Sequence, residues 1–420
     1  MKEEFLHYIF EQQLLENKEF TILSSGIKNT DAGPDFFNAK IKIDNTIWAG
    51  NVEIHINASD WKKHNHHKDA AYDNIILHLV LNDDAKVYNS KGNEIPSFVM
   101  HFPIQLYQKY EELIQSKQWL PCHKEWKNIN SFDKTFLFDA LAIARLERKS
   151  QYYFELIQNK QNNWEEAFYQ ALARGIGGKL NTIPFELLAQ SLPLNILLKH
   201  SNNILQIEAL LFGQAGMLKD EKEDVYYQEL QKEYSFLQKK YSLKPIKFSM
   251  WKFSKIRPYS FPTVRISQFA QIIKKNGRLF NLILENLSLS FLQDIFLISS
   301  SAYWNNHYQF ETKSINRKKR IGKATFHHIV INTIIPFFFA YAQQINNEQL
   351  KSNLLDLLAK IPAEKNSIIT HWKEYGIKPL NALESQSVIE LRNEYCKHNR
   401  CIDCKIAHKI LTLSWNESTL

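Results

Sequence analysis

The apolar positions in the first 120 residues change from a helical to an extended pattern. Residues 1–18 carry apolar side chains at helical spacing. After residue 20, short runs predict strands over 20–23, 35–43, 46–56, 74–81, 86–89 and 98–102, followed by a helix over 104–116. Asp44-Asn45 predicts a hairpin turn between the second and third of these strands. The run 74–81 is apolar on both faces, which is typical of a central strand covered by helices.

Strand patterns almost vanish after Cys122, and helical patterns take over. They recur over 131–160, 163–174, 184–200, 204–218, 222–240, 264–275, 278–298, 324–345, 348–360, 366–374 and 384–395. No fixed repeat period is present, which argues against a regular solenoid. The pattern therefore predicts an α+β protein, with an α/β domain in residues 1–120 and a larger all-α domain in residues 121–420.

Composition narrows the class of protein. The 420 residues are 44% hydrophobic and 23% charged, which is the balance of a soluble globular chain. The longest apolar stretch, 329–342, is interrupted by Asn332 and Pro336 and is shorter than the ~20 residues that span a bilayer. It predicts a buried helix with a proline break. No signal peptide pattern opens the chain, so we expect a cytoplasmic protein without membrane contact.

Charge is distributed unevenly. Residues 1–120 hold 12 lysines, no arginine and 17 acidic residues, whereas the remaining chain carries a net charge of +13. The positive charge of residues 121–420 suits an acidic partner such as nucleic acid. The alternative is that this net charge only reflects drift in a lysine-rich composition. The acidic first part, with 7 of the 15 histidines, suits a cation site.

Two carboxylates in the first domain are predicted to meet. A hairpin turning at 44–45 pairs residues whose numbers sum to about 89–90, which places Asp35 close to Glu53 and His55. Two carboxylates at such a distance repel each other unless a cation lies between them, and a hard ion such as Mg²⁺ or Mn²⁺ fits best. The alternative is that Asp35 caps a local turn after Gly33-Pro34 and that Glu53 lies on a solvated face.

The order of helix, Asp-initiated strand, Glu-x-Lys-like strand, helix and apolar strand resembles the PD-(D/E)XK nuclease superfamily. The residues that carry the resemblance are Gly33-Pro34-Asp35 and Glu53-Ile54-His55. It implies that Asp35 and Glu53 bind the metal ion and that a glutamate of the first helix, Glu4 or Glu11, joins them.

The chain departs from that superfamily at the lysine, which positions or activates the attacking water. His55 stands in its place, where a neutral imidazole could act as a base or as a third ligand. The lysine function could also have moved to Lys40, Lys63 or Lys68, or catalysis could have been lost.

A histidine-rich segment follows the third strand. His64, His66 and Lys68 are candidates for contacts with the scissile phosphate. A second interpretation is a zinc or other transition-metal site built from His55, Asp69 and the histidines at 64, 66 and 67. His78, inside the apolar run, predicts a hydrogen-bonded core histidine.

The cysteines cluster near the end of the chain. Cys396, Cys401 and Cys404 have the spacing C-x4-C-x2-C, and Cys122 is the only other cysteine. In a cytosolic chain this pattern favours a metal over a disulfide, and four thiolates could hold Zn²⁺ or an iron–sulfur cluster. The alternative is four reduced, buried cysteines.

Basic residues in the helical part are candidates for nucleic-acid binding. Two groups stand beside aromatic residues that could stack bases: Arg257 and Arg265, and the run Arg317, Lys318, Lys319 and Arg320. A solvated face and inter-helix packing are the alternatives. The glycine run 175–178 follows a predicted helix and lacks P-loop spacing, which argues against a phosphate-cradling loop.

Longer blocks of the chain resemble a domain-of-unknown-function family of uncharacterised bacterial proteins. They include NTDAGPDFFNAKI, GNVEIHINASDWKKHNHHKDAAYDNIILHLV, LLFGQAGML, RPYSFPTVRISQFA and YCKHNRCIDCKIAHKIL. This resemblance implies no particular activity. The sequence thus predicts a metal-dependent nuclease; the alternatives are a non-catalytic nucleic-acid-binding or structural relative, and a His/Asp metal hydrolase acting on a small substrate.

Overall fold

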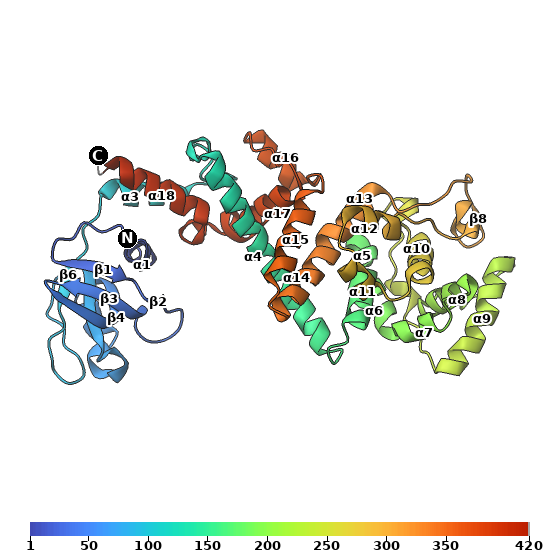
Figure 1. Ribbon diagram of the computed structural model, residues 1–420, viewed down its shortest axis with the longest axis horizontal. Coiled ribbons are helices and arrows are strands. Elements are labelled where there is room, and N and C mark those ends of the chain that lie inside the picture. Colours follow the sequence, from blue (N-terminus) through green and yellow to red (C-terminus); the bar gives the residue numbers. More distant parts are fainter. Residues whose placement is uncertain (419–420) are drawn as a thin grey trace. The chain divides into compact units, whose positions relative to one another are not determined.

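The computed structural model describes residues 1–418, which form two compact units (Figure 1). The first unit contains Met1–Leu137 together with the chain from Glu390 onward, and the second contains Phe138–Ile389. This division differs from the boundary expected at residue 120. A pattern of apolar positions does not reveal that the end of a chain returns to its beginning.

A mixed sheet forms the centre of the first unit, as the sequence predicts for an α+β protein. Its strands follow the chain in order: β1 (Phe20–Ser24), β3 (Phe36–Ile43), β4 (Thr46–Asn57), β5 (Ile75–Asn82) and β6 (Ser97–Val99). The short β2 (Ile27–Lys28) pairs with β3. β3 is antiparallel to both of its main neighbours, whereas β4, β5 and β6 are mutually parallel. The predicted strand at 86–89 is reduced to an isolated bridge between Tyr88 and Glu94.

The β3–β4 hairpin has the predicted register. Ile43 pairs with Thr46 and Ala39 pairs with Gly50, so the residue numbers sum to 89. Between Phe36 and Ala39 the register shifts at a bulge, where Asn38 has a φ of 57°. After the bulge Phe36 pairs with Val52, which brings the preceding Asp35 opposite Glu53. A bulge of this kind re-aims side chains at the end of a strand.

Four α-helices accompany this sheet: α1 (Glu3–Glu11), α2 (Asp60–Lys63), α3 (Ile104–Gln115) and α18 (Lys405–Ser418). α1 buries five residues, among them Phe5 and Phe10, and contacts β4. α18 lies along α3 (Figure 1). The burial of α1 follows its amphipathic pattern and holds one of its faces against the central strand.

The second unit is helical. Its helices are α4 (Ser131–Gln158, from Phe138 onward), α5 (Trp164–Ile176), α6 (Gly178–Ser191), α7 (Leu194–Leu198), α8 (Ile204–Gln214), α9 (Val225–Tyr241), α10 (Pro262–Asn276), α11 (Leu279–Glu285), α12 (Leu289–Phe296), α13 (Lys323–Ile329), α14 (Ile335–Gln344), α15 (Glu348–Ala359), α16 (Ser367–Glu374) and α17 (Ala382–Glu390). A short hairpin of β7 (His307–Gln309) and β8 (Thr312–Lys313), which the sequence pattern did not predict, interrupts them.

The apolar stretch at 329–342 lies in the core of this unit. A π-helical turn, Val330–Ile334, joins α13 to α14, and Pro336 stands in the first turn of α14. By length and composition, the continuous helical segment Lys323–Gln344 could cross a membrane. However, 67% of its most apolar 18-residue stretch is buried within the fold. Buried core helices of soluble proteins have the same features.

Candidate functional site

The loop before β3 presents Asp35 to the second half of β4. Asn29 organises this loop: its backbone N–H donates to the Asp35 carbonyl at 2.7 Å, and its side-chain amide donates to the Asp31 carbonyl at 3.0 Å. Gly33 has a φ of 109°, which a residue with a Cβ adopts only with strain. The Gly-Pro-Asp segment is therefore held in one conformation where β3 begins.

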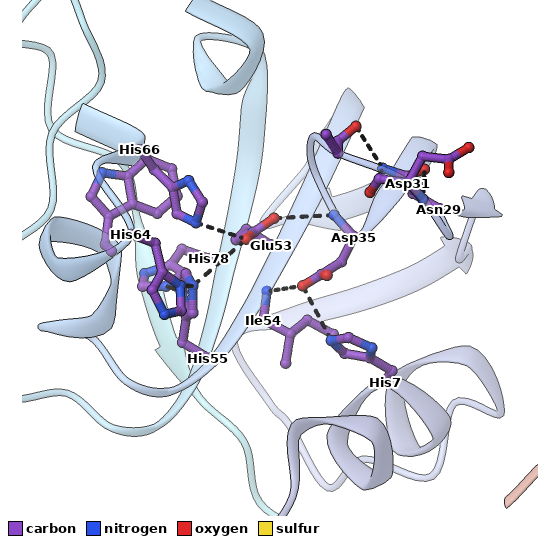
Figure 2. A network of polar contacts seen from close by, with 12 residues as sticks. His7, Asn29, Asp31, Asp35, Glu53, Ile54, His55, His64, His66 and His78 are labelled. Atoms are coloured by element: carbon purple, nitrogen blue, oxygen red, sulfur yellow. Dashed lines mark hydrogen bonds and ion pairs between the residues drawn. The ribbon is translucent and has the colours of Figure 1, made fainter. Parts of the chain in front are cut away.

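Asp35 and Glu53 are joined by two reciprocal hydrogen bonds. The backbone N–H of Asp35 donates to Glu53 Oε2 at 3.0 Å, and the backbone N–H of Ile54 donates to Asp35 Oδ2 at 2.9 Å (Figure 2). Each carboxylate thus accepts from the backbone of the other strand. The predicted meeting of these two residues is confirmed.

Glu53 is an unusually buried carboxylate, with 5% of its surface exposed. Burial raises its pKa, and the negative charge of Asp35 raises it further, whereas the nearby His66 side chain lowers it. The protein therefore disfavours the charged form of Glu53 unless a cation is present.

Imidazole nitrogens gather around the Glu53 carboxylate. His66 Nε2 lies 3.3 Å and His55 Nε2 lies 3.6 Å from Glu53 Oε1. His64 Nδ1 is 3.1 Å from His55 Nε2, and ligand atoms of the three histidines all lie within 4.8 Å of one another. His55 and His66 are buried, whereas His64 is exposed. The structure thus brings together three members of the second sequence interpretation, whereas His67 and Asp69 are not in this group.

A chain of hydrogen bonds runs from His55 into the sheet. His55 Nδ1 is 2.9 Å from His78 Nε2, and His78 Nδ1 is 2.9 Å from Ser97 Oγ. If the lone pair of His55 Nε2 faces a metal, Nδ1 carries the proton and donates to His78, which in turn donates to Ser97. His78 is fully buried and hydrogen-bonded, as predicted from its apolar context.

Burial keeps both of these histidines neutral. It lowers the pKa of His55 to about 3, helped by the nearby charges of His78, His66 and His64. It also lowers the pKa of His78 to about 4. Neutral imidazole is the form that binds metals.

Aromatic rings fix the positions of the imidazoles. The Trp61 ring meets the rings of His55, His66 and His78 edge to face, at centroid distances of 5.2–6.4 Å. The Tyr72 ring stacks on His66 at 3.9 Å. The segment after β4 therefore folds over a small core around Trp61, which presents His66 to Glu53.

Sequence reasoning missed His7. Its Nε2 lies 3.2 Å from Asp35 Oδ2, so His7 is the α1 residue that contacts this carboxylate, in the place expected for Glu4 or Glu11. Both glutamates have other electrostatic neighbours, Tyr110 and Tyr8 respectively. The signal for His7 was its position between the buried Leu6 and Tyr8 of the amphipathic helix α1.

No lysine contacts either carboxylate in the described part of the chain. Lys63 pairs with Asp60 at 2.6 Å, and Lys40 and Lys68 are exposed. Asp69 accepts a hydrogen bond from the Ala71 backbone N–H at 2.9 Å and caps a short turn, so its carboxylate is occupied. The water-positioning role expected for Lys68 has no geometric support.

The assembled donor set fits a divalent cation. His7 Nε2 and His66 Nε2 are buried without a hydrogen-bond partner, and both lie within ion-pair distance of a carboxylate oxygen. Each nitrogen thus faces a carboxylate oxygen at 3.2–3.3 Å without forming a regular hydrogen bond, and a cation bound by both atoms would satisfy them. A mixture of carboxylate and imidazole ligands suits Mn²⁺ and Zn²⁺ better than Mg²⁺, which prefers oxygen.

The four cysteines come together in the first unit. All are buried and free of disulfides: Cys122, Cys396, Cys401 and Cys404. Burial raises the pKa of the Cys122 thiol well above its usual range, and the charges of the other three raise it further. Mutual electrostatic effects also link the three C-terminal cysteines to one another. The distant Cys122 is thus brought to the C-x4-C-x2-C segment.

The predicted basic residues differ in accessibility. Arg317 and Lys318 are exposed, and so is Arg320, whose Nε donates to the Leu297 carbonyl at 2.6 Å. Lys319 is buried, and its ammonium donates to the Asn305 carbonyl at 2.9 Å and to the Trp304 carbonyl. The prediction that Lys319 binds nucleic acid is therefore wrong, because a buried ammonium that donates to two backbone carbonyls is not free to contact nucleic acid. Arg257 and Arg265 line one cavity.

Comparison with known proteins identifies a family but no activity. The model of a family described as protein of unknown function (DUF2851) matches residues 3–367. No curated protein and no solved structure matches the chain significantly. The chain belongs to the DUF2851 family, and the cysteine segment at 396–404 lies beyond the matched residues.

Proposed function

We propose that this member of the DUF2851 family is a metal-dependent nuclease that hydrolyses phosphodiester bonds. The observation that carries the proposal is the reciprocal pairing of Asp35 with Glu53 in the second half of the central strand β4, with imidazole nitrogens around Glu53. Nucleic acid, either DNA or RNA, is the proposed partner, and the cytoplasm is the proposed location.

We also propose that the first unit, beyond its α+β class, has a PD-(D/E)XK-like fold. Its support is the order of elements: helix α1, strand β3 after Asp35, strand β4 with Glu53, helix α2 and the apolar strand β5. This is the order on which the resemblance rests. The departures are His55 at the lysine position and His7 at the first-helix position.

In the proposed site, Asp35 and Glu53 hold the metal, with His55 and His66 as further ligands. The bound metal would activate a water molecule and stabilise charge that develops on the phosphate. His78 fixes the tautomer of His55 through the 2.9 Å contact between their ring nitrogens. His64, the exposed member of the histidine trio, lies where solvent and substrate reach the site. It is therefore the residue proposed to contact the scissile phosphate.

Cleavage of labelled single- and double-stranded DNA and RNA tests the proposal, with Mg²⁺, Mn²⁺, Zn²⁺ or EDTA present. The variants are Glu53→Gln and Asp35→Asn, which remove charge with little change of shape. Asp31→Asn is the matched control, because Asp31 lies in the same loop and is exposed. We expect metal-dependent cutting by the wild type and the control, and at least a hundredfold loss in the two site variants. Equal cutting by all four proteins would exclude this site as the catalytic one.

The histidine trio favours a second candidate, a zinc-dependent hydrolase acting on a small substrate. Three imidazoles with ligand atoms within 4.8 Å of one another form a donor set typical of Zn²⁺. Activity on small phosphate or carboxylic esters with Zn²⁺, without cutting of nucleic acid, would favour this candidate. Salt-sensitive binding of nucleic acid without any cutting would instead indicate a non-catalytic relative.

We also propose that the four cysteines bind Zn²⁺ or an iron–sulfur cluster. Four thiols buried together are each disfavoured as thiolates by burial, and a coordinated metal removes that penalty by stabilising the thiolates. Such a site would fasten the C-terminal segment to the part of the first unit that contains Cys122, which is a stabilising role.

A further inference from the structure

A cavity of about 630 Å³ in the helical unit has a basic lining. Four cationic side chains face it, and its lining contains no carboxylate: Lys179, Lys255, Arg257 and Arg265. His328, Tyr259, Ser260 and Thr325 add polar groups. A cavity of this size admits a small ligand, and the one-sided charge selects an anion.

Arg265 is the unusual member of this lining. It is 7% exposed, and it donates to three neutral oxygens: Gln268 Oε1 at 3.0 Å, Thr325 Oγ1 at 3.1 Å and Ser260 Oγ at 3.4 Å. A guanidinium has five N–H donors, so these bonds leave two of them without a partner among the described residues. No carboxylate in the described chain forms an ion pair with Arg265. Burial lowers its pKa to about 10, which expresses the cost of keeping this charge out of water.

The backbone of the glycine run contributes to the same cavity. Gly175, Gly177 and Gly178 lie in its wall, and a Cβ on Gly178 would meet nothing within 4 Å. Gly178 has a φ of 60° and opens helix α6, whose first residues also line the cavity. Lys179 follows the run directly, whereas Lys255, Arg257 and Arg265 come from other segments.

We propose that this cavity binds a phosphate group, with Arg265 as the anchor and Arg257, Lys179 and Lys255 around it. The planar fork of a guanidinium donates to two phosphate oxygens at once. This geometry favours phosphate over a halide or another compact anion. The phosphate could belong to a nucleic-acid strand or to a free nucleotide. This inference rests on the helical unit and does not depend on the metal site.

Calorimetric titration of the full chain with pyrophosphate, a mononucleotide and a short oligonucleotide tests the inference. We expect at least one of these ligands to bind, with an affinity that falls as salt increases. Arg265→Met and Arg257→Gln should each weaken binding about tenfold to a hundredfold, as loss of a charge-assisted hydrogen bond predicts. Arg278→Gln is the matched control, because Arg278 is an exposed arginine outside the cavity lining.

Thermal unfolding separates binding from structure. Arg265→Met removes the donor to the buried Gln268 Oε1 and should lower the melting temperature, whereas Arg257→Gln changes an exposed side chain and should leave it unchanged. Loss of binding at an unchanged melting temperature supports the inference, and the ligand that binds most tightly identifies the source of the phosphate. If no ligand binds the wild type, or if both cavity variants bind as tightly as Arg278→Gln, the inference is overturned. Neither result depends on cleavage, so failure of the nuclease proposal would be seen separately.

Discussion

Replacing Glu53 by glutamine should abolish stabilisation of the first unit by Mn²⁺. In the wild type the cation would occupy the space between Glu53, Asp35 and the imidazoles, where two ring nitrogens lack hydrogen-bond partners. Mn²⁺ prefers oxygen and nitrogen to thiolate ligands, so the cysteines should contribute little to the effect. The metal then stabilises only the folded state of this unit.

The size of the effect follows from linkage. A ligand at a hundred times its dissociation constant stabilises the folded state by about 2.7 kcal/mol. For a unit of ~150–250 residues, each kcal/mol raises the melting temperature by about 2–4 °C. We therefore expect Mn²⁺ to raise the melting temperature of the wild-type unit by about 5–11 °C, and that of Glu53→Gln by less than about 1 °C.

The metal-free variant provides the second half of this test. Glutamine keeps an oxygen that accepts from the Asp35 N–H and removes a buried negative charge beside Asp35. Without metal, Glu53→Gln should therefore melt no lower than the wild type, and relief of the buried charge is worth up to about 1–3 kcal/mol. Differential scanning calorimetry with Mn²⁺ or EDTA measures both quantities, with Asp31→Asn as the control. An undiminished Mn²⁺ shift in Glu53→Gln would refute the ligand assignment. A large loss of metal-free stability would show that Glu53 is a structural acceptor.

Three further predictions concern other parts of the chain. His78→Gln should weaken Mn²⁺ binding about 10–100-fold, because His78 orients the imidazole of His55; unchanged affinity in a calorimetric titration would rule out this role. Cys396→Ser should lower the zinc or iron content of the purified protein, measured by elemental analysis; a metal content equal to that of the wild type would exclude a cysteine-bound metal. Gly213→Ala should destabilise the helical unit by about 1–3 kcal/mol, because its Cβ would lie 2.1 Å from the Tyr234 ring; an unchanged urea midpoint would contradict this.

The hairpin register was predictable because it depends on local rules. The turn at Asp44-Asn45 and the alternation of apolar residues fix which residues of β3 and β4 face each other, and the approach of Asp35 to the segment Glu53–His55 follows. The helical segments of the second unit were also predicted, because their apolar spacing is regular. The bulge at Asn38 was not predicted, yet it shifts the register by the one residue that places Asp35 opposite Glu53.

Contacts between distant segments escaped prediction. His7 reaches Asp35 only because α1 packs on β4, and the link from His78 to Ser97 requires that β5 and β6 be neighbours. The burial of Lys319 was hidden for a similar reason. A run of cations is typical of a solvated face, but here the neighbouring loop offers backbone carbonyls that capture one of them.

Both proposed sites are marked by one buried group whose charged form burial disfavours. Glu53 in the first unit has a second carboxylate and the neutral imidazole of His55 among its neighbours, and Arg265 in the second unit donates only to neutral oxygens. Burial of each charge costs stability in the unit that contains it. The missing partners are of opposite sign, a cation for Glu53 and an anion for Arg265. A phosphodiester substrate together with a divalent metal ion supplies both, which is why the two sites, argued from separate parts of the chain, favour the same class of substrate.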